Sequence, residues 1–215
     1  MSRSGETLTV APQANGPFLG RTLQVVRDLS VDEQLYLYDQ TRLLKEALST
    51  GDPAAVDRFR INRWDLGVYL FFLEDSTRTK ESFRNAAKFH HVKLNDFTAS
   101  GSSFTKKESI TDTVKMLVGY SQQSVFVVRT KLEGTCRWLE ETVGEYAQKA
   151  GLPPVAFING GDGRHEHPTQ EFLDEFSFLE QKEWDRAHIH VALVGDLFHG
   201  RTIHSKVDGL QVFRE

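Results

Sequence analysis

The stretch VYLFFLEDSTRTK, residues 68–80, decides the fold. Residues 68–73 are all apolar or aromatic, a run typical of a strand that is buried on both faces. From Ser76 the pattern changes to that of an amphipathic helix, predicted to end at His90. Because a buried strand that leads directly into a helix is the first half of a βαβ unit, this stretch predicts an α/β protein.

Short apolar runs and amphipathic segments alternate on both sides of this stretch. The predicted strands are residues 68–73, 92–96, 124–129, 155–159 and 189–195. The predicted helices are residues 31–49, 76–90, a segment from 110, 132–150, a segment from 168 and 202–210. This order indicates a mainly parallel sheet flanked by helices and joined by right-handed crossovers. In such sheets ligands bind at the carboxyl ends of the strands, so we expect functional residues directly after strands.

The sequence divides into three parts. Residues 1–17 are small and polar without periodicity and are expected to form a flexible tail. A charged stretch at residues 181–186 suggests that a first domain, residues 18–182, ends there. Residues 183–215 are far fewer than the roughly 100 residues that an independent lobe usually needs, so we expect them to be the start of an incomplete second α/β lobe.

Composition excludes several classes of protein. The 215 residues are 39% hydrophobic, and 26 Lys and Arg stand against 30 Asp and Glu, which argues against a protein that holds nucleic acid by its phosphates. The longest apolar run is much shorter than the ~20 residues of a membrane-spanning helix. The single cysteine, Cys136, allows no intrachain disulfide and is predicted to pack in the apolar stripe of its helix. We therefore expect a cytoplasmic protein without a membrane or nucleic-acid partner.

Residues 74–80 form the first candidate site, because they follow the strongest strand and open a helix. The hydroxyls of Ser76, Thr77 and Thr79, the guanidinium of Arg78 and the free N–H groups of the first helical turn converge there. This combination is typical of a phosphate site. The alternative is that Ser76 only caps the helix and Arg78 is a solvated charge. The glycine-rich run of a nucleotide P-loop does not precede the helix.

A second candidate site follows the predicted strand at residues 155–159. His167 stands directly before Pro168, which is favoured in the first helical position, and Gln170 follows. A histidine there can donate a hydrogen bond to a carbonyl oxygen that gains negative charge, and Gln170 offers an amide for reading a small polar group. Arg129 closes another strand and is expected at the same rim. The alternatives are a capping turn with a surface histidine and a surface arginine.

Two further features carry weaker signals. The polar loop at residues 102–109, which contains Lys106, reads by itself as a solvated loop. His165 with His167, and His188 with His190, could each place two imidazoles on one face, but no third ligand at suitable spacing accompanies either pair. We predict no metal site.

Together these motifs resemble one enzyme family. The motifs are residues 76–79 with 82–83, the lysine loop that ends at 112–113, residues 127–129, residues 161–163 leading to 167–170, and residues 194–196 running into 200–202. Their order and spacing over residues 18–210 resemble the aspartate carbamoyltransferases. Residues 131–134 and 204–210 look like the branch in which catalytic and regulatory chains are fused.

The resemblance implies a reaction and a domain order. Carbamoyl phosphate would give its carbamoyl group to the amino group of L-aspartate in de novo pyrimidine biosynthesis, without metal or organic cofactor. Residues 18–182 would be the carbamoyl-phosphate-binding domain and residues 183–215 the start of the aspartate-binding domain. The residues implied to bind phosphate are Ser76, Thr77, Arg78 and Thr79. Arg129 would bridge the phosphate and the carbonyl oxygen, Thr79 and His167 would donate to that oxygen, Gln170 would hold the carbamoyl amide, and Arg201 would bind an aspartate carboxylate.

The resemblance also implies a homotrimer with shared sites. Lys106, with Ser102 or Ser103, would reach into the neighbouring subunit and act as a catalytic residue there, although Lys107 stands where the family has glycine. A regulatory chain or domain is a further implied partner.

The family's downstream aspartate loop has no counterpart before Glu215, so the chain is expected to be a fragment or a natural form with an incomplete acceptor site. Ornithine carbamoyltransferase shares the phosphate motif and stays open as an alternative. A non-catalytic carbamoyl-phosphate-binding module, or a subunit that lends its Lys106 loop to a partner, is the alternative outside enzymes.

Overall fold

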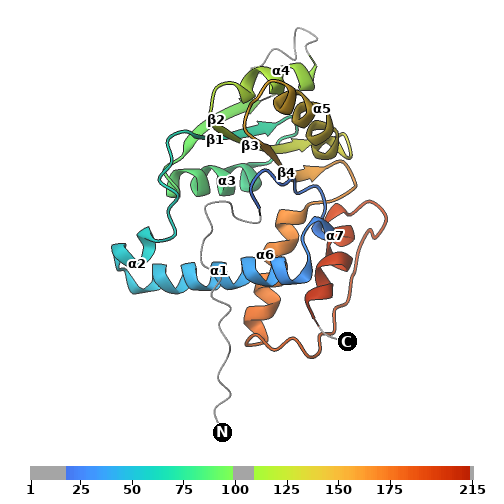
Figure 1. Cartoon of the computed structure of the whole chain (residues 1–215). Coiled ribbons are helices and arrows are strands. Elements are labelled where there is room, and N and C mark those ends of the chain that lie inside the picture. Colours follow the sequence, from blue (N-terminus) through green and yellow to red (C-terminus); the bar gives the residue numbers. More distant parts are fainter. Residues whose placement is uncertain (1–17, 99–108, 214–215) are drawn as a thin grey trace.

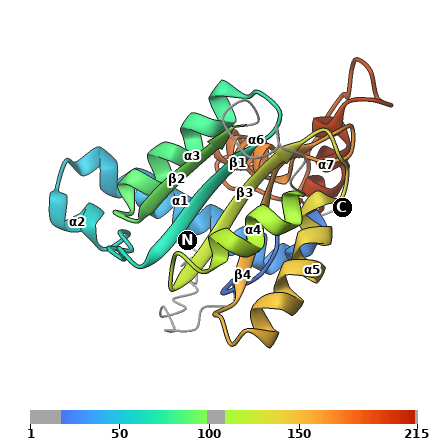
Figure 2. The ribbon, with the colours of Figure 1, turned by 90° about the horizontal axis from the view of Figure 1, so that it is seen from above.

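A computed structural model describes residues 18–98 and 109–213 of the chain. Four strands form one parallel sheet in the order β2-β1-β3-β4 (Figures 1 and 2). The strands are β1 (Leu66–Phe72), β2 (Lys93–Thr98), β3 (Gln123–Thr130) and β4 (Val155–Asp162). The helices are η1 (Val26–Asp28), α1 (Val31–Thr50), α2 (Pro53–Asp57), α3 (Thr77–Phe89), α4 (Ile110–Val118), α5 (Thr135–Lys149), α6 (Pro168–Gln181), α7 (Arg201–Gly209) and η4 (Leu210–Val212). The prediction of a parallel sheet flanked by helices is confirmed.

Helices α4 and α5 pack on one face of the sheet. Tyr69 and Phe71 of β1 alternate with residues of the opposite face and join Leu139 and Cys136 of α5 in one apolar cluster. Cys136 is 2% exposed, as predicted for a packing thiol. On the other face of the sheet, which α3 covers, Leu70 of β1 lies in a separate apolar cluster. Strand β1 is therefore buried on both faces, which explains its continuous apolar run.

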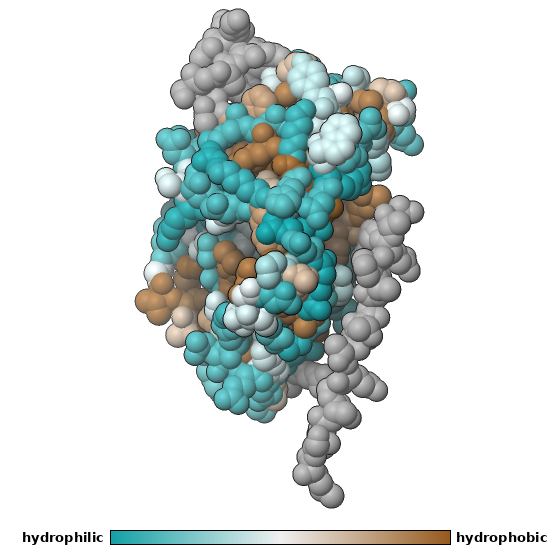
Figure 3. Space-filling model, turned by 90° about the vertical axis from the view of Figure 1, so that its left-hand side faces the viewer, coloured by the Kyte–Doolittle hydropathy of each residue, from teal (hydrophilic) through white to brown (hydrophobic). Residues whose placement is uncertain are grey.

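Helices α1 and α6 form a second layer below the sheet in Figure 1. Tyr38 of α1 and Leu179 of α6 meet in a separate apolar cluster, which is closed by Val212 of η4. Helix α1 begins with the predicted capping box, in which Ser30 and Glu33 each bond the other's backbone N–H. On the face shown in Figure 3, apolar residues form separate groups within a mainly hydrophilic surface.

The topology creates a crevice between two neighbouring strands. The chain leaves β1 towards β2 on one side, whereas it leaves β3 towards β4 on the other side. The carboxyl ends of β1 and β3 therefore border the place where ligands bind in open α/β sheets. No helix in the two described ranges combines the length and apolar character needed to cross a membrane.

The predicted strand at residues 189–195 is wrong. The segment has no regular structure and reaches 88% exposure at Val194. A strand needs a neighbour for its backbone hydrogen bonds, and none of the described strands pairs with this segment.

The burial predicted for two helices also needs correction. In the sequence, Phe172, Leu173, Phe176 and Leu179 recur at helical spacing, and this pattern predicts that Leu173 faces inward from α6. In the structure Leu173 is 60% exposed, and Glu171 and Glu175 are buried instead. Leu132 lies before the first residue of α5 and is 62% exposed, so the apolar stripe of this helix begins at Cys136. Helical spacing identifies a stripe, but charged partners on a neighbouring helix decide which stripe is buried.

Candidate active site

The phosphate motif begins where β1 ends. Ser76 occupies the N-cap position of α3, but its side chain makes no capping hydrogen bond, which favours the ligand interpretation of this hydroxyl over the capping one. Arg78 is exposed and Thr79 is half-buried, and both line a cavity of about 770 Å³ together with Ser76. Thr77 is exposed and is not among the lining residues, so the structure does not bring its side chain together with the other candidates.

His167 reaches the same cavity from the N-terminus of α6. Its ring lies between two hydroxyls, with Nε2 3.3 Å from Thr79 Oγ1 and Nδ1 3.3 Å from Thr169 Oγ1. Its backbone N–H donates to Ser205 Oγ at 3.0 Å. Burial, assisted by repulsion from Arg129 and Arg201, lowers the pKa of His167 to about 4. The imidazole is therefore neutral at pH 7 and can donate one hydrogen bond without carrying a charge.

Arg129 is placed by the end of β4. Its Nη1 donates to Gly160 O at 2.8 Å, and its Nη2 lies 3.4 Å from Glu74 Oε1. Burial, with repulsion from Arg201, lowers the pKa of Arg129 despite the opposing effect of Glu74. The Arg129 side chain is 9% exposed, so it presents a fixed positive charge rather than a solvated one.

An irregularity in the sheet allows this placement. Val128 pairs with Asn159 and Thr130 pairs with Asp162, so β4 accommodates one more residue than β3 between the two pairs. Gly161 has a φ of +110°, and a Cβ on it would lie 2.5 Å from Arg129 Nη1. The bulge turns the Gly160 carbonyl towards Arg129, and only glycine leaves room for the guanidinium.

Glu74 contacts two arginines of the cavity, although the sequence analysis gives this residue no role of its own. Its Oε1 accepts from Arg201 Nη2 at 3.1 Å and from Arg129 Nη2 at 3.4 Å. Burial raises the pKa of Glu74, but the hydrogen bond from Arg201 and the charges of both arginines outweigh it, and the net shift is downward. Glu74 thus holds two guanidinium groups together that would otherwise repel each other. Its position directly after the predicted strand at residues 68–73, two residues beyond the end of β1, is the signal that could have identified it.

The cavity also contains the remaining described candidates. Gln170 and Arg201 line it, and so do Thr169, Asp174 and Thr202, which were not predicted. Gln170 Nε2 donates to Asp174 Oδ1 at 3.1 Å. The structure therefore brings together side chains from the ends of β1, β3 and β4 and from α7. Ser102, Ser103 and Lys106 lie outside the described residues.

The chemistry of the cavity favours an anionic ligand. Three arginines line it, Arg78, Arg129 and Arg201, and the N-terminus of α3 points its free N–H groups towards it. Among the residues that the structure covers, no group of three His, Cys, Asp or Glu side chains could hold a metal ion. The arrangement can hold a phosphate or carboxylate beside a neutral hydrogen-bond donor.

Comparisons with known proteins give a consistent result. A family model described as "Aspartate/ornithine carbamoyltransferase, carbamoyl-P binding domain" matches residues 21–180. The chain is 58% identical over 198 residues to "Protein PyrBI" of Treponema denticola, covering 92% of this chain and 37% of that protein. It is 35% identical over 190 residues to the aspartate carbamoyltransferase catalytic subunit of Methanocaldococcus jannaschii, covering 87% and 56%.

Solved structures agree. Aspartate transcarbamoylase from Trypanosoma cruzi, in complex with carbamoyl aspartate and phosphate, superposes with a TM-score of 0.75 at 25% identity and covers 96% of this chain and 58% of that one. The chain therefore spans between about a third and three fifths of the length of these proteins.

Proposed function

Because the chain belongs to the family of aspartate/ornithine carbamoyltransferase carbamoyl-phosphate-binding domains, we propose that it binds carbamoyl phosphate and serves the transfer of the carbamoyl group to L-aspartate. The products are N-carbamoyl-L-aspartate and phosphate, in pyrimidine biosynthesis. The observation that carries this proposal is the convergence of Arg78, Arg129 and His167 from the ends of three strands on one cavity.

The proposed reaction needs two kinds of stabilisation. The amino nitrogen of aspartate attacks the carbonyl carbon, the bond from that carbon to the phosphate oxygen breaks, and the amine loses a proton. Negative charge develops on the carbonyl oxygen and on the leaving phosphate. Ser76, Thr77, Arg78 and Thr79, with the N-terminus of α3, are proposed to bind the phosphate.

The carbonyl end of the substrate is assigned to the other side of the cavity. Arg129 bridges the phosphate and the carbonyl oxygen, and Thr79 and His167 donate to that oxygen. The low pKa of His167 supports this role, because a neutral imidazole can donate a hydrogen bond to the carbonyl oxygen. A charged imidazolium would instead attract the carboxylates of aspartate. Gln170 holds the carbamoyl amide, and Arg201 takes a carboxylate of aspartate.

The complete acceptor site is proposed to need more chain than residues 183–215 provide. We assign residues 18–182 to the carbamoyl-phosphate-binding domain and 183–215 to the start of the aspartate-binding domain. Lys106, with Ser102 or Ser103, is proposed to act in the neighbouring subunit of a homotrimer, and a regulatory chain or domain is a further partner. The buried thiol of Cys136 suits a reducing compartment, and we propose the cytoplasm.

Binding and turnover test the proposal separately. Calorimetry with carbamoyl phosphate should give saturable binding to the 215-residue chain, and Arg78→Ala should weaken it at least tenfold. Lys88→Ala is the matched control, because it removes one positive charge from an exposed position of the same helix outside the cavity. Unchanged affinity in Arg78→Ala would show that the phosphate site is assigned wrongly.

A colorimetric assay for ureido products then compares aspartate with ornithine as acceptor. Product from aspartate supports the transferase. Product from ornithine alone would overturn the choice of acceptor, and binding without turnover would leave this chain as the carbamoyl-phosphate-binding part only.

A further inference from the structure

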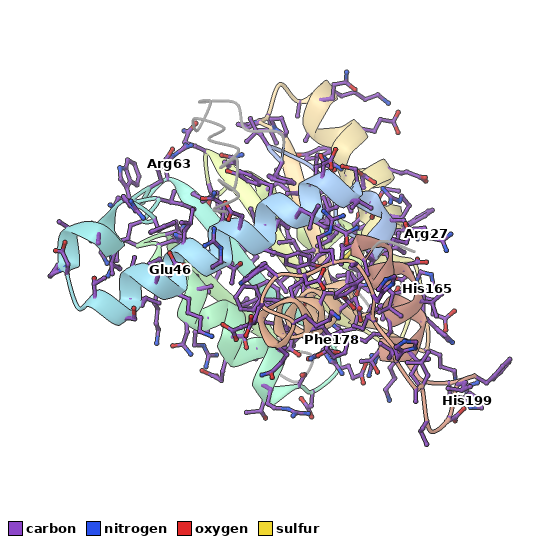
Figure 4. All side chains as sticks on the ribbon, turned by 90° about the horizontal axis from the view of Figure 1, so that it is seen from below. Arg27, Glu46, Arg63, His165, Phe178 and His199 are labelled. Carbon is purple, nitrogen blue, oxygen red and sulfur yellow. The ribbon has the colours of Figure 1, made fainter. Side chains whose placement is uncertain are left out.

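A buried cluster of charges lies between α6 and α7, outside the machinery assigned above. Lys206 of α7 is 7% exposed, and its Nζ lies 2.9 Å from Glu171, 3.0 Å from Asp174 and 3.7 Å from Glu175. The ring of Phe178 covers the ammonium group, with its centroid 4.7 Å from Nζ. Figure 4 labels Phe178 at the place where these helices lie side by side.

The cluster contains one cation and three carboxyl groups. Burial opposes the charged form of Lys206, but hydrogen bonds to Glu171 and Asp174 outweigh it and raise the pKa of the ammonium. Burial also raises the pKa values of Glu171 and Glu175, whose side chains interact, so the pair resists carrying two negative charges. This resistance limits the excess of negative charge in the cluster, and Asp174 is the partner of Lys206 on the cavity side.

Asp174 connects this cluster to the cavity, because each of its carboxylate oxygens has its own partner. Oδ2 lies 3.0 Å from Lys206 Nζ, and Oδ1 accepts from Gln170 Nε2 at 3.1 Å. The side chain of Asp174 is 36% exposed, so without Lys206 the carboxylate could turn to water. Lys206 therefore fixes the acceptor that orients the Gln170 amide.

We propose that Lys206 is a positioning residue which, through Asp174, makes Gln170 select a ligand that carries an N–H donor; this inference rests on the proposed carbamoyl-phosphate site. A carboxylate that accepts at Oδ1 requires the NH₂ end of the Gln170 amide on its side. The Oε1 atom then faces the ligand as a hydrogen-bond acceptor. A carbamoyl NH₂ group satisfies this acceptor, whereas a methyl group in the same place leaves it unpaired.

Loss of the Lys206 contact predicts a specific defect. The Gln170 amide becomes free to rotate by 180°, and a rotated amide presents NH₂ instead of oxygen to the ligand. Discrimination between NH₂ and CH₃ then disappears, while the phosphate contacts of Arg78 and Arg129 stay as they were. A general distortion of the site would instead weaken every phosphate ligand to the same degree.

Two stable ligands isolate this effect. Phosphonoacetamide carries a phosphonate, a carbonyl and an NH₂ group, and acetonylphosphonate differs only by a methyl in place of the NH₂. Calorimetry measures both affinities, and that of inorganic phosphate, for the 215-residue chain and its variants. Asp174→Ala is the main variant, because position 174 is partly exposed and alanine leaves Gln170 Nε2 without its acceptor. Lys206→Met tests the cation directly.

Glu171→Gln is the matched control, since it changes another partner of Lys206 into a neutral group of the same shape as the protonated acid. The expected result is that the wild-type chain and Glu171→Gln prefer phosphonoacetamide by about tenfold. Asp174→Ala, and Lys206→Met where circular dichroism shows it folded, should bind both ligands within twofold of each other, without any loss of phosphate affinity.

Three outcomes overturn the inference. Retained tenfold preference in Asp174→Ala would show that Asp174 does not orient Gln170, and parallel losses for all three ligands would show a purely structural role. Absence of any preference in the wild-type chain would overturn both the inference and the assignment of Gln170 to the carbamoyl amide. Failure of the proposed function can therefore be distinguished from failure of the positioning role of Lys206.

Discussion

Alanine at position 161 should damage the anion site while leaving the fold intact. Gly161 has a φ of +110°, which L-residues rarely adopt, and the added Cβ would lie 2.5 Å from Arg129 Nη1 and 3.2 Å from His167 Cδ2. The backbone strain alone is worth about 1–3 kcal/mol. The guanidinium cannot simply swing aside, because it is buried and donates to Gly160 O.

The expected loss of anion affinity follows from the displacement of the Arg129 guanidinium. A charge-assisted hydrogen bond to a phosphate is worth about 1.5–3 kcal/mol, and loss of one such bond lowers affinity roughly tenfold to a hundredfold. We therefore expect Gly161→Ala to bind inorganic phosphate and phosphonoacetamide at least tenfold more weakly. Its free energy of unfolding should fall by about 1–3 kcal/mol through the strain.

Urea denaturation and calorimetry measure the two effects, and Gly144→Ala is the matched control. Gly144 lies inside α5, and a methyl group added there would point into open space. Alanine at this position should therefore stabilise the chain by about 0.5–1 kcal/mol and leave binding unchanged. A folded Gly161→Ala chain with wild-type affinity for both ligands would refute the claim that Gly161 secures the position of Arg129.

Three further outcomes are expected. Where the acceptor site is complete and the ureido assay gives product from aspartate, His167→Ala should slow its formation by about a hundredfold, because one preorganised donor to the carbonyl oxygen is lost. A loss below threefold would exclude His167 from this role. The pKa of His167 is lowered to about 4 in the folded chain, so as the pH drops the unfolded chain takes up a proton at this residue at a higher pH than the folded chain does. The free energy of unfolding therefore falls as the pH drops from 6.5 towards 4. In urea titrations, the contribution of His167 to the free energy of unfolding should be about 2 kcal/mol smaller at pH 5 than at pH 7. His167→Asn should remove that difference. Ser30→Ala should lower the free energy of unfolding by about 1 kcal/mol, because the Glu33 N–H loses its side-chain acceptor.

Most of the sheet could be predicted because each of its strands is a short run with a clear boundary. The apolar run at residues 68–73 lies almost entirely within β1 (Leu66–Phe72), and Ser30 with Glu33 marks the start of α1. Residues 189–195 have the same composition as a buried strand, yet they form none. A strand is completed by its neighbours, and sequence within the segment carries no information about whether they are present.

The cavity itself could be predicted from topology. Motifs after three strands of a parallel sheet must meet at one edge, which places Arg78, Arg129 and His167 together. The contacts that shift the pKa values of these residues and hold their side chains could not be predicted. Glu74 and Arg201 are 127 positions apart in the chain, and nothing in either segment shows that they pair.

Helix α6 illustrates the same limit for burial. Periodicity favours Leu173 as an inward residue, whereas the helix buries Glu171 and Glu175. The free energy of burying a carboxyl group depends on its partner, and here the partner is Lys206 on another helix. Apolar patterning therefore predicts the existence of α6 but not the face that it presents to α7.

The extra residue in β4 gives the chain an unusual sensitivity to length. Substitutions near the bulge alter one contact at a time, whereas deletion of a single residue between Asn159 and Asp162 would restore regular pairing with β3. The Gly160 carbonyl would then leave Arg129, and the position of the guanidinium would change with it. In an alignment of related chains, a gap in these four positions should therefore be a stronger sign of a lost anion site than a substitution of any one lining residue.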